Sequence, residues 1–168
     1  MSEEHPETIT FTPIGVMRSS HHEPRDTPIQ PVFAPDCEGC IEVDPRYEEG
    51  LRDIEGFSHL IVLYHLHRAG APQMTVRPFL EDREHGVFAT RHPARPNAIG
   101  LSIVELVRRE GATLHLRGVD ILDGTPVLDI KPYVSRFDRP ESVRDGWAGQ
   151  VAESDAEKRG RRGYKERA

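Results

Sequence analysis

The chain has 168 residues, of which 36% are apolar and 30% charged, and its formal net charge is −6. This composition predicts a single globular domain with a buried core, and the negative charge excludes indiscriminate binding of nucleic acid. A nucleic-acid partner therefore requires a local basic patch, such as the C-terminal stretch EKRGRRGYKERA. No apolar run approaches the roughly 18 residues of a transmembrane helix, and the first residues, MSEEHPETIT, do not resemble a signal peptide. We expect a soluble, cytoplasmic protein with no membrane partner.

The N-terminal part of the chain combines one strand with one long loop. Residues 1–10 carry few large apolar groups, so we expect a frayed N-terminus. The segment FTPIGVMRS, residues 11–19, has the composition of a first strand. Residues 20–39 are rich in proline and polar side chains and have neither helical nor strand periodicity. A loop of this length in a compact domain is usually functional or disordered.

The two cysteines of the chain, Cys37 and Cys40, form the pattern CEGC. Such a pair can be half of a zinc site, a redox pair, or two thiols beside a turn glycine. The sequence has no second pair to complete a four-thiolate site, which favours the last interpretation. A mixed zinc site that includes the nearby His21 and His22 is the alternative.

A short strand and a short helix are predicted next. CIEV, residues 40–43, has strand composition. In residues 44–56, Asp44 is suitable as an N-cap, Pro45 suits the first helical position, and Gly56 lies past the end.

The segment FSHLIVLYHLHR, residues 57–68, is predicted to form a strand buried on both faces, because it is long and rich in branched and aromatic side chains. Side chains alternate between the two faces of a strand. The two faces are then Ile61, Leu63, His65 and His67 on one side and Leu60, Val62, Tyr64 and Leu66 on the other. Two histidines therefore share a face near the end of the strand.

Five further strands are predicted, separated by turn signals such as REG and LDGTP. They are TVRPF (75–79), GVFAT (86–90), GLSIVELVRRE (100–110), TLHLRGVDIL (113–122) and TPVLDIKPYV (125–134). Many short strands with one clear helix indicate a mainly β protein whose antiparallel sheet folds into a barrel or a sandwich. We expect one or two short helices beside this sheet and a partly disordered C-terminal tail.

Beyond about residue 136 the strand-like alternation ends and charged residues predominate. The apolar residues left to hold this segment are Val143, Trp147 and Val151. We expect a short docked helix followed by a flexible basic end.

Familiar nucleotide-binding and hydrolase motifs are missing from the sequence. No GxGxxG motif follows a predicted strand, and neither a phosphate-binding loop nor a GxSxG motif is present. A doubly wound nucleotide-binding fold is therefore unsupported. The candidate functional residues lie instead in three polar clusters.

The first cluster is YHLHR, which contains His65 and His67. Two histidines on one strand face can bind a metal, as in cupin-like barrels. A third ligand is not evident, and we predict no metal site. For His67, contact with another kind of ligand and plain packing are the remaining interpretations.

The second cluster is FATRHPARPNAIGLS, residues 88–102, which we call the ledge. Its two prolines fix φ and restrict the residues before them, so we predict a rigid binding surface. Arg91 and Arg95 offer forked donors for a carboxylate or phosphate, and Asn97 can cap a turn or bind a polar edge. The alternative is an ordinary connection with solvated arginines.

The third cluster is LDGTPVLDIKPYV, residues 122–134. Its DGTP turn precedes Asp129, Lys131 and Tyr133, which alternate onto one strand face. A carboxylate, an ammonium and a phenol are costly to bury without partners. They are either functional or part of a structural salt bridge at a barrel rim.

These three stretches, with IGVMRS near the start and PIQP in the long loop, resemble the motifs of one family in the same order. It is the TrmO family of tRNA adenine-N6 methyltransferases, also called TsaA-like or YaeB-like. The similarity covers residues 11–136. It divides the chain into a frayed N-terminus (1–10), a TrmO-like S-adenosylmethionine-binding barrel (11–136) and a charged C-terminal extension (137–168).

The resemblance implies a small, mostly antiparallel barrel that binds S-adenosylmethionine without a Rossmann fold and forms a homodimer. Characterised members methylate the N6 nitrogen of N6-threonylcarbamoyladenosine next to the anticodon of tRNA. Carried over to matching positions, the cofactor-binding residues are Ile29, Gln30, Pro31, His67, Arg68, Arg91, Leu101, Ser102, Asp123, Gly124 and Thr125.

Methyl transfer requires the nucleophile and the methyl group to be held in near-attack geometry. The acceptor nitrogen also loses a proton, and because a carbonyl flanks its N–H group we expect little demand for a strong base. The predicted catalytic residues are Asp129, Lys131 and Tyr133, of which Asp129 and Tyr133 position the substrate. The predicted substrate-binding residues are Arg18, Arg95 and Asn97.

Three alternatives stay open at this point. The acceptor of a methyltransferase of this family can be a molecule other than tRNA. The protein can be a non-catalytic sensor of S-adenosylmethionine. It can also be a cupin-like metal-binding barrel that uses His65 and His67.

Overall fold

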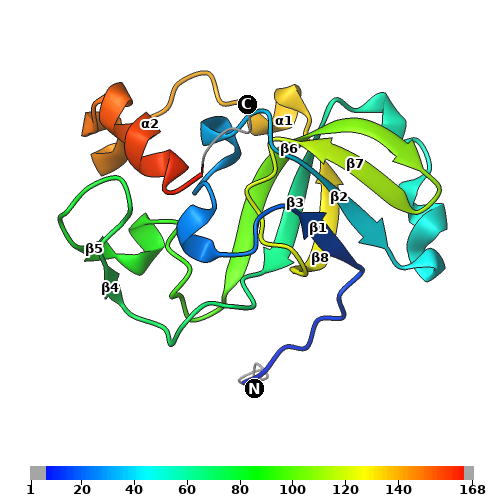
Figure 1. The fold of residues 1–168 in the computed structure, drawn as a ribbon, viewed down its shortest axis with the longest axis horizontal. Helices are drawn as coiled ribbons and strands as arrows, with labels where there is room; N and C mark the ends of the chain where they lie inside the picture. The colour runs from blue at the N-terminus through cyan, green and yellow to red at the C-terminus, as the bar shows by residue number, and fades with distance from the viewer. Residues whose placement is uncertain (1–6, 165–168) are drawn as a thin grey trace, which may run out of the picture.

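The computed structural model describes residues 7–164. Six strands close into an antiparallel barrel in the order β1-β2-β7-β6-β3-β8 (Figure 1). Their bounds are β1 Gly15–Ser19, β2 Glu38–Val43, β3 His59–His65, β6 Ile99–Glu110, β7 Thr113–Arg117 and β8 Pro126–Pro132. The mainly β fold with a small antiparallel barrel is therefore confirmed.

Short elements connect and flank these strands. Outside the barrel, β4 (Thr75–Val76) pairs with β5 (His85–Gly86). The 3₁₀ helices are η1 Pro24–Asp26, η2 Pro31–Phe33, η3 Pro45–Leu51, η4 Ile54–Gly56, η5 Val87–Ala89 and η6 Gly146–Gln150. The α-helices are α1 Ser135–Asp138 and α2 Glu153–Arg161.

Strand alternation fills the barrel with apolar side chains. On β3, Leu60, Val62 and Tyr64 share one face, as the alternation predicts, and this face is buried inside the barrel. They meet apolar side chains from the other strands, among them Met17, Ile41, Val104, Leu114, Leu116 and Val127. The opposite face of β3 is only half-buried, so the prediction of a strand buried on both faces is wrong. A closed small barrel packs its inside with side chains and leaves the outside of its strands open.

Residues 44–56 form the short helices η3 and η4 rather than one α-helix. Asp44 is the N-cap as predicted, since its carboxylate accepts a hydrogen bond from the Arg46 amide at 3.0 Å. Asp53 adopts a left-handed conformation with φ of 69°, which separates the two helices. Gly56 is the last residue of η4 rather than a residue beyond it.

Residues 86–90 were predicted as a strand but contain the helix η5. The Thr90 hydroxyl donates to the Val87 carbonyl at 2.8 Å and closes this turn. A threonine that bonds back to a nearby carbonyl competes with strand pairing.

The C-terminal extension packs against residues 20–37, which we call the N-terminal loop (Figure 1). The Ile29 amide donates to the Gly160 carbonyl at 2.9 Å. Gly160 is buried against the Phe33 ring, and a Cβ at this position would overlap the ring. The expected docked helix is therefore present as α2, although Val143 does not hold it, since Val143 is 64% exposed.

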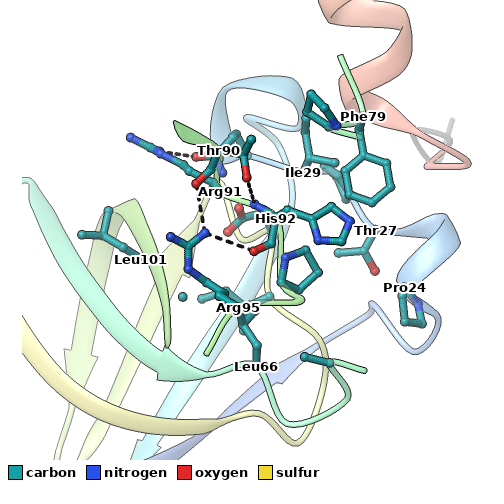
Figure 2. Close-up of a pocket in the computed structure, with 18 of the residues that line it drawn as sticks. Pro24, Thr27, Ile29, Leu66, Phe79, Thr90, Arg91, His92, Arg95 and Leu101 are labelled. Atoms are coloured by element: carbon teal, nitrogen blue, oxygen red, sulfur yellow. Dashed lines mark hydrogen bonds between the residues drawn. The ribbon is translucent and has the colours of Figure 1, made fainter. Parts of the chain in front are cut away.

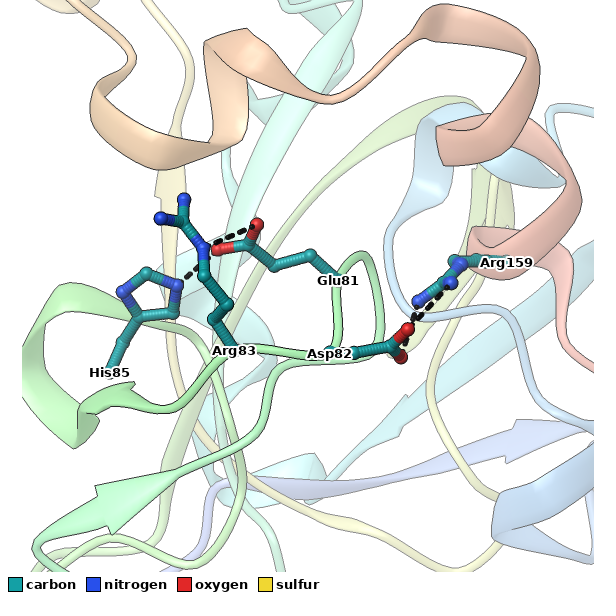
Figure 3. A network of polar contacts seen from close by, with 5 residues as sticks. All are labelled: Glu81, Asp82, Arg83, His85 and Arg159. Atoms are coloured by element: carbon teal, nitrogen blue, oxygen red, sulfur yellow. Dashed lines mark hydrogen bonds and ion pairs between the residues drawn. The ribbon is translucent and has the colours of Figure 1, made fainter.

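Trp147 joins the extension to the segment that carries β4 and β5. Its indole N–H donates to the Ala89 carbonyl at 2.8 Å, and its ring stacks on His85 with 4.8 Å between centroids. Glu81 in turn hydrogen-bonds His85 and forms an ion pair with Arg83 at 3.6 Å (Figure 3). The imidazole is thus held on one edge by a carboxylate while its face supports the indole.

A second contact of the extension is the ion pair between Arg159 and Asp82, at 3.0 Å (Figure 3). The Asp82 side chain is 82% exposed, so water competes for its charge. Exposed ion pairs of this kind contribute only about 0–1 kcal/mol to stability. Trp147 is therefore the main expected anchor of the extension.

No helix within residues 7–164 is both long and apolar enough to span a membrane. The expected fraying of residues 1–10 falls largely on residues 1–6, which lie outside the described residues. The last part of the expected disordered tail, residues 165–168, lies outside them as well.

Replacing the anchor should release the extension without unfolding the barrel. Trp147→Ala removes a ring stack and a hydrogen bond, each worth about 0.5–1.5 kcal/mol. We expect amide hydrogen exchange in residues 146–161 to accelerate by roughly 5- to 100-fold, while exchange in the barrel strands stays unchanged. Arg159→Ala is the matched control and should change the same amides less than about fivefold. Equal acceleration in both variants would contradict the assignment of Trp147 as the anchor.

Candidate functional site

A pocket of about 800 Å³ opens at the end of the barrel where β3 ends and β6 begins. Figure 2 shows how its side chains converge from separate segments of the chain. The segments are the N-terminal loop, residues 64–69, residues 78–80, the ledge, residues 120–125, and residues 145–148 and 162 of the extension.

The N-terminal loop reaches the pocket through Ile29 and Gln30. Pro24 and Pro31 start the short helices η1 and η2 on either side of them. Proline suits the first helical position because its φ is already helical. Two stiff turns therefore hold the short extended segment that carries the pocket residues.

Arg95 holds the ledge in shape. Its guanidinium donates to the carbonyl oxygens of Thr90 at 2.9 Å and His92 at 3.1 Å (Figure 2). The His92 amide donates to the Thr90 hydroxyl at 3.1 Å. The rigid ledge predicted from its prolines is thus held by an arginine as well, and that arginine also lines the pocket.

Arg91 links the ledge to the N-terminal loop across the pocket. One of its Nη atoms donates to Gln30 Oε1 at 2.6 Å. A guanidinium has five N–H donors in a fixed fork, so this contact leaves capacity for a carboxylate or phosphate. Two residues predicted to bind the cofactor are therefore in direct contact.

His67, Arg68 and Thr125 line the pocket next to the end of β3. The glycine of the DGTP turn, Gly124, has φ of +78°, a conformation that favours glycine and brings Thr125 to the pocket. His67 Nδ1 lies 3.3 Å from the Thr125 hydroxyl. Partial burial and nearby positive charge lower the pKa of His67 below its usual value, so the imidazole is neutral at pH 7.

The floor of the pocket contains a buried polar chain that the sequence analysis did not identify. The Ser102 hydroxyl donates to Asp120 at 2.5 Å, and the Tyr64 hydroxyl lies 3.0 Å from that of Ser102. Tyr64 is paired directly with Gly100 across β3 and β6, and a Cβ at Gly100 would overlap its ring. Asp120 is only 7% exposed, and burial raises its pKa to about 7.

An aromatic wall completes the pocket, and it too was missed by the sequence analysis. Phe79 stacks on His92 with 5.8 Å between ring centroids. The guanidinium of Arg162 lies 4.2 Å from the centre of the Phe79 ring, a cation–π distance. Trp147 lines the pocket beside them. Arg162 and Trp147 belong to the extension, which the sequence analysis treated as separate from the barrel domain.

The structure brings together most of the residues predicted to bind the cofactor. Those that line the pocket are Ile29, Gln30, His67, Arg68, Arg91, Leu101 and Thr125. Pro31, Ser102, Asp123 and Gly124 lie next to lining residues without lining it themselves. The Asp123 carboxylate accepts from the Ser19 amide at 3.1 Å, so its visible role is to hold the DGTP turn.

The residues predicted to be catalytic lie elsewhere. Asp129 and Lys131 form an ion pair at 2.8 Å on β8, opposite Leu63 and Ile61 of β3. An ion pair is therefore present, and both of its side chains are largely exposed. Tyr133 follows the end of β8 and does not line the pocket either. Their catalytic roles stay predictions.

Of the predicted substrate-binding residues, only Arg95 lines the pocket. Arg18 forms an ion pair with Glu42 at 3.0 Å between β1 and β2. Asn97 is exposed on the ledge, outside the pocket. Strand alternation and sequence motifs do not tell how far a side chain lies from the pocket. The substrate-binding roles of Arg18 and Asn97 therefore stay predictions.

Among residues 7–164, no three His, Cys, Asp or Glu side chains are grouped so that they could hold a metal ion. This includes the surroundings of His65 and His67. Cys37 is buried and Cys40 is half-buried on β2, where burial raises the pKa of the Cys40 thiol.

The chain matches the family described as tRNA-methyltransferase O N-terminal domain over residues 16–139. A probable S-adenosyl-L-methionine-binding protein of Pyrococcus abyssi is 56% identical over 142 residues, which cover 84% of this chain and 77% of that protein. A tRNA (adenine(37)-N6)-methyltransferase of Homo sapiens is 37% identical over 140 residues, which cover 79% of this chain and 32% of that protein.

A crystal structure of TrmO from Pseudomonas aeruginosa is similar with a TM-score of 0.71 and 41% identity, covering 83% of this chain and 62% of that one. The chain thus spans about a third of the human protein's length and less than two thirds of the Pseudomonas chain. The motifs, the barrel and the pocket agree with these matches. The chain belongs to the TrmO family, as its sequence motifs indicate.

Proposed function

We propose that this protein is an S-adenosylmethionine-dependent methyltransferase that modifies the N6 nitrogen of N6-threonylcarbamoyladenosine beside the anticodon of tRNA. The contact between Arg91 and Gln30 carries the proposal, because it joins the PIQP loop and the ATR segment of the ledge at one pocket. The names of the Pyrococcus and human relatives support the same cofactor and the same class of substrate.

The residues of the pocket fit S-adenosylmethionine. Its volume of about 800 Å³ is that of a small-molecule site. Arg91 offers donors to the carboxylate of the amino-acid part. Arg68 lies nearby but donates to the His22 carbonyl at 2.6 Å and pairs with Glu23 at 3.6 Å. Ile29 and Leu101 offer apolar contacts to the adenine ring. When bound, S-adenosylmethionine supplies an electrophilic methyl group on a sulfonium sulfur.

The chain's own residues offer aromatic surfaces to the acceptor. Phe79 and Trp147 line one side of the pocket. Phe88 lies at the pocket with 75% of its surface exposed, so its ring is free to stack on an unpaired base.

The charge of the pocket suits an anionic substrate even though the chain as a whole carries −6. Four arginines line it, against the two aspartates Asp120 and Asp145; the arginines are Arg68, Arg91, Arg95 and Arg162. This is the local basic patch that a tRNA partner requires. Binding through such contacts should weaken as salt is added. Because the proposed substrate is tRNA, we also propose that the protein acts in the cytoplasm.

A calorimetric titration with S-adenosylmethionine tests the cofactor site. We expect saturable binding that Arg91→Ala weakens roughly 10- to 100-fold, because a hydrogen bond to a charged group contributes about 1.5–3 kcal/mol. Arg108→Ala is the matched control, since it removes an arginine paired with Glu110 outside the pocket, and it should bind like the wild type. Folded wild-type protein that binds no S-adenosylmethionine would refute the proposal. Transfer of a labelled methyl group to tRNA with and without the threonylcarbamoyl group then identifies the acceptor.

We also propose that the protein works as a homodimer, because the outer surface of β3 and β6 is apolar. Their register pairs Ile61 with Ile103 and Leu63 with Leu101. Ile99, Leu101 and Ile103 are each 40–42% exposed. A contiguous apolar patch on a protein surface is typical of an interface. Leu101 belongs to both this patch and the pocket, so a second copy would border the site.

Charging the patch should therefore dissociate the dimer. Ile103→Asp places a carboxylate on the surface that would be buried and outside the pocket lining, and we expect monomers in sedimentation equilibrium where the wild type is dimeric. Val107→Asp is the control, because Val107 is 42% exposed on the same strand but outside the patch. A wild-type protein that stays monomeric at micromolar to millimolar concentration would contradict the homodimer.

A further inference from the structure

A buried carboxylate at the floor of the pocket has no role in the function described so far. Asp120 is 7% exposed and lines the pocket. Within residues 7–164, the one side chain that donates a hydrogen bond to it is Ser102, at 2.5 Å from Oδ1. Ser102 is itself in contact with the Tyr64 hydroxyl, which is 3.0 Å away.

A purely structural role explains this arrangement poorly. Burying a carboxylate is costly unless a cation pairs with it, and none of the described residues forms an ion pair with Asp120. Arg91 acts on Asp120 through its charge, but its guanidinium hydrogen-bonds Gln30. An asparagine could accept the same hydrogen bond from Ser102 without this cost. Unlike an asparagine amide, the carboxylate carries a negative charge and can take up a proton.

We propose that the Asp120 carboxylate takes the proton from the acceptor nitrogen during methyl transfer, and that Ser102 and Tyr64 are positioning residues that orient it. The inference rests on the proposed methyltransferase function and adds the identity of its proton acceptor. A positioned base of this kind typically contributes roughly 10²–10⁴-fold to the rate.

The step balances in atoms and charge. The acceptor nitrogen forms a bond to the methyl carbon as the carbon–sulfur bond breaks and leaves its electron pair on sulfur. The positive charge of the sulfonium disappears, and the N–H proton passes to Asp120. The neutral carboxylic acid afterwards returns this proton to water.

The electrostatic surroundings tune Asp120 for this task. Burial raises its pKa to about 7, while the hydrogen bond from Ser102 and the charge of Arg91 hold it below the value that burial alone would give. A base is most efficient when its pKa lies near the working pH.

Other titratable groups of the pocket change charge in different pH ranges. Burial raises the pKa of Tyr64, so its hydroxyl stays protonated at neutral pH. Burial lowers the pKa values of His67 and His92 below the ordinary 6.5 of an imidazole. Of these four groups, Asp120 is the one whose pKa lies near 7, and the loss of the transition in Asp120→Asn is what assigns it.

The pH dependence of single-turnover methyl transfer tests the proposal. A protonated Asp120 cannot accept a proton, so the rate should rise through about pH 7 and level off above it. Asp120→Asn should lower the plateau roughly 10²- to 10⁴-fold and abolish this transition, measured at S-adenosylmethionine concentrations that saturate the variant in a calorimetric titration. Ser102→Ala should move the transition to higher pH, because it removes a hydrogen bond that stabilises the charged form. Asp53→Asn, an exposed aspartate outside the pocket, is the control and should not move it.

A second measurement does not depend on turnover. The ¹³C resonance of the Asp120 carboxyl, assigned by its loss in Asp120→Asn, should titrate near pH 7 in the free protein and at higher pH in Ser102→Ala. Titration below about pH 5, or an Asp120→Asn rate within about threefold of the wild type, would overturn the proposal. Failure of the wild type to bind S-adenosylmethionine would instead refute the methyltransferase function itself.

Discussion

The antiparallel register of β3 and β6 places Tyr64 directly opposite Gly100, and the open end of the barrel depends on this pair. The tyrosine ring can lie there only because Gly100 has no Cβ. From this position the Tyr64 hydroxyl reaches Ser102, and Ser102 reaches Asp120. The same alternation turns Leu101 outward. A slip by one residue would exchange the polar chain with the apolar outer surface, so one pairing fixes both the floor of the pocket and the proposed dimer face.

The two arginines of the ledge do different physical work although they lie in one short motif. Arg95 donates to the carbonyl oxygens of Thr90 and His92 and thereby replaces the backbone partners that a proline-containing loop lacks. Arg91 holds a single side-chain oxygen, that of Gln30, and stays exposed. Stiffness and binding capacity thus come from separate guanidinium groups. A ligand can compete for Arg91 without disturbing the fold of the ledge.

Local signals in the sequence predicted a mainly antiparallel β protein, and the resemblance to the TrmO family narrowed it to a small barrel. Alternation grouped the residues of β3 into its two faces without telling which is inward, and the family motifs identified Gln30 and Arg91. Alternation also put Asp129 and Lys131 on a shared face, but it does not tell whether that face borders a pocket. Asp120 was missed because its apolar neighbours made residues 113–122 resemble one continuous strand. The strand β7 ends at Arg117, and the connection that follows turns the carboxylate into the pocket.

The contacts that hold the C-terminal extension join segments that lie far apart in the sequence, so local patterns do not reveal them. Trp147 reaches the Ala89 carbonyl across 58 residues, and Arg159 reaches Asp82 across 77. The predicted cofactor residues lie within the segment that matches the TrmO family, residues 16–139, whereas Trp147 and Arg162 lie beyond it. The pocket is therefore lined both by residues of the matched segment and by Trp147 and Arg162 beyond it. The aromatic wall joins the two parts, because Phe79 lies within the matched segment and its ring meets the guanidinium of Arg162.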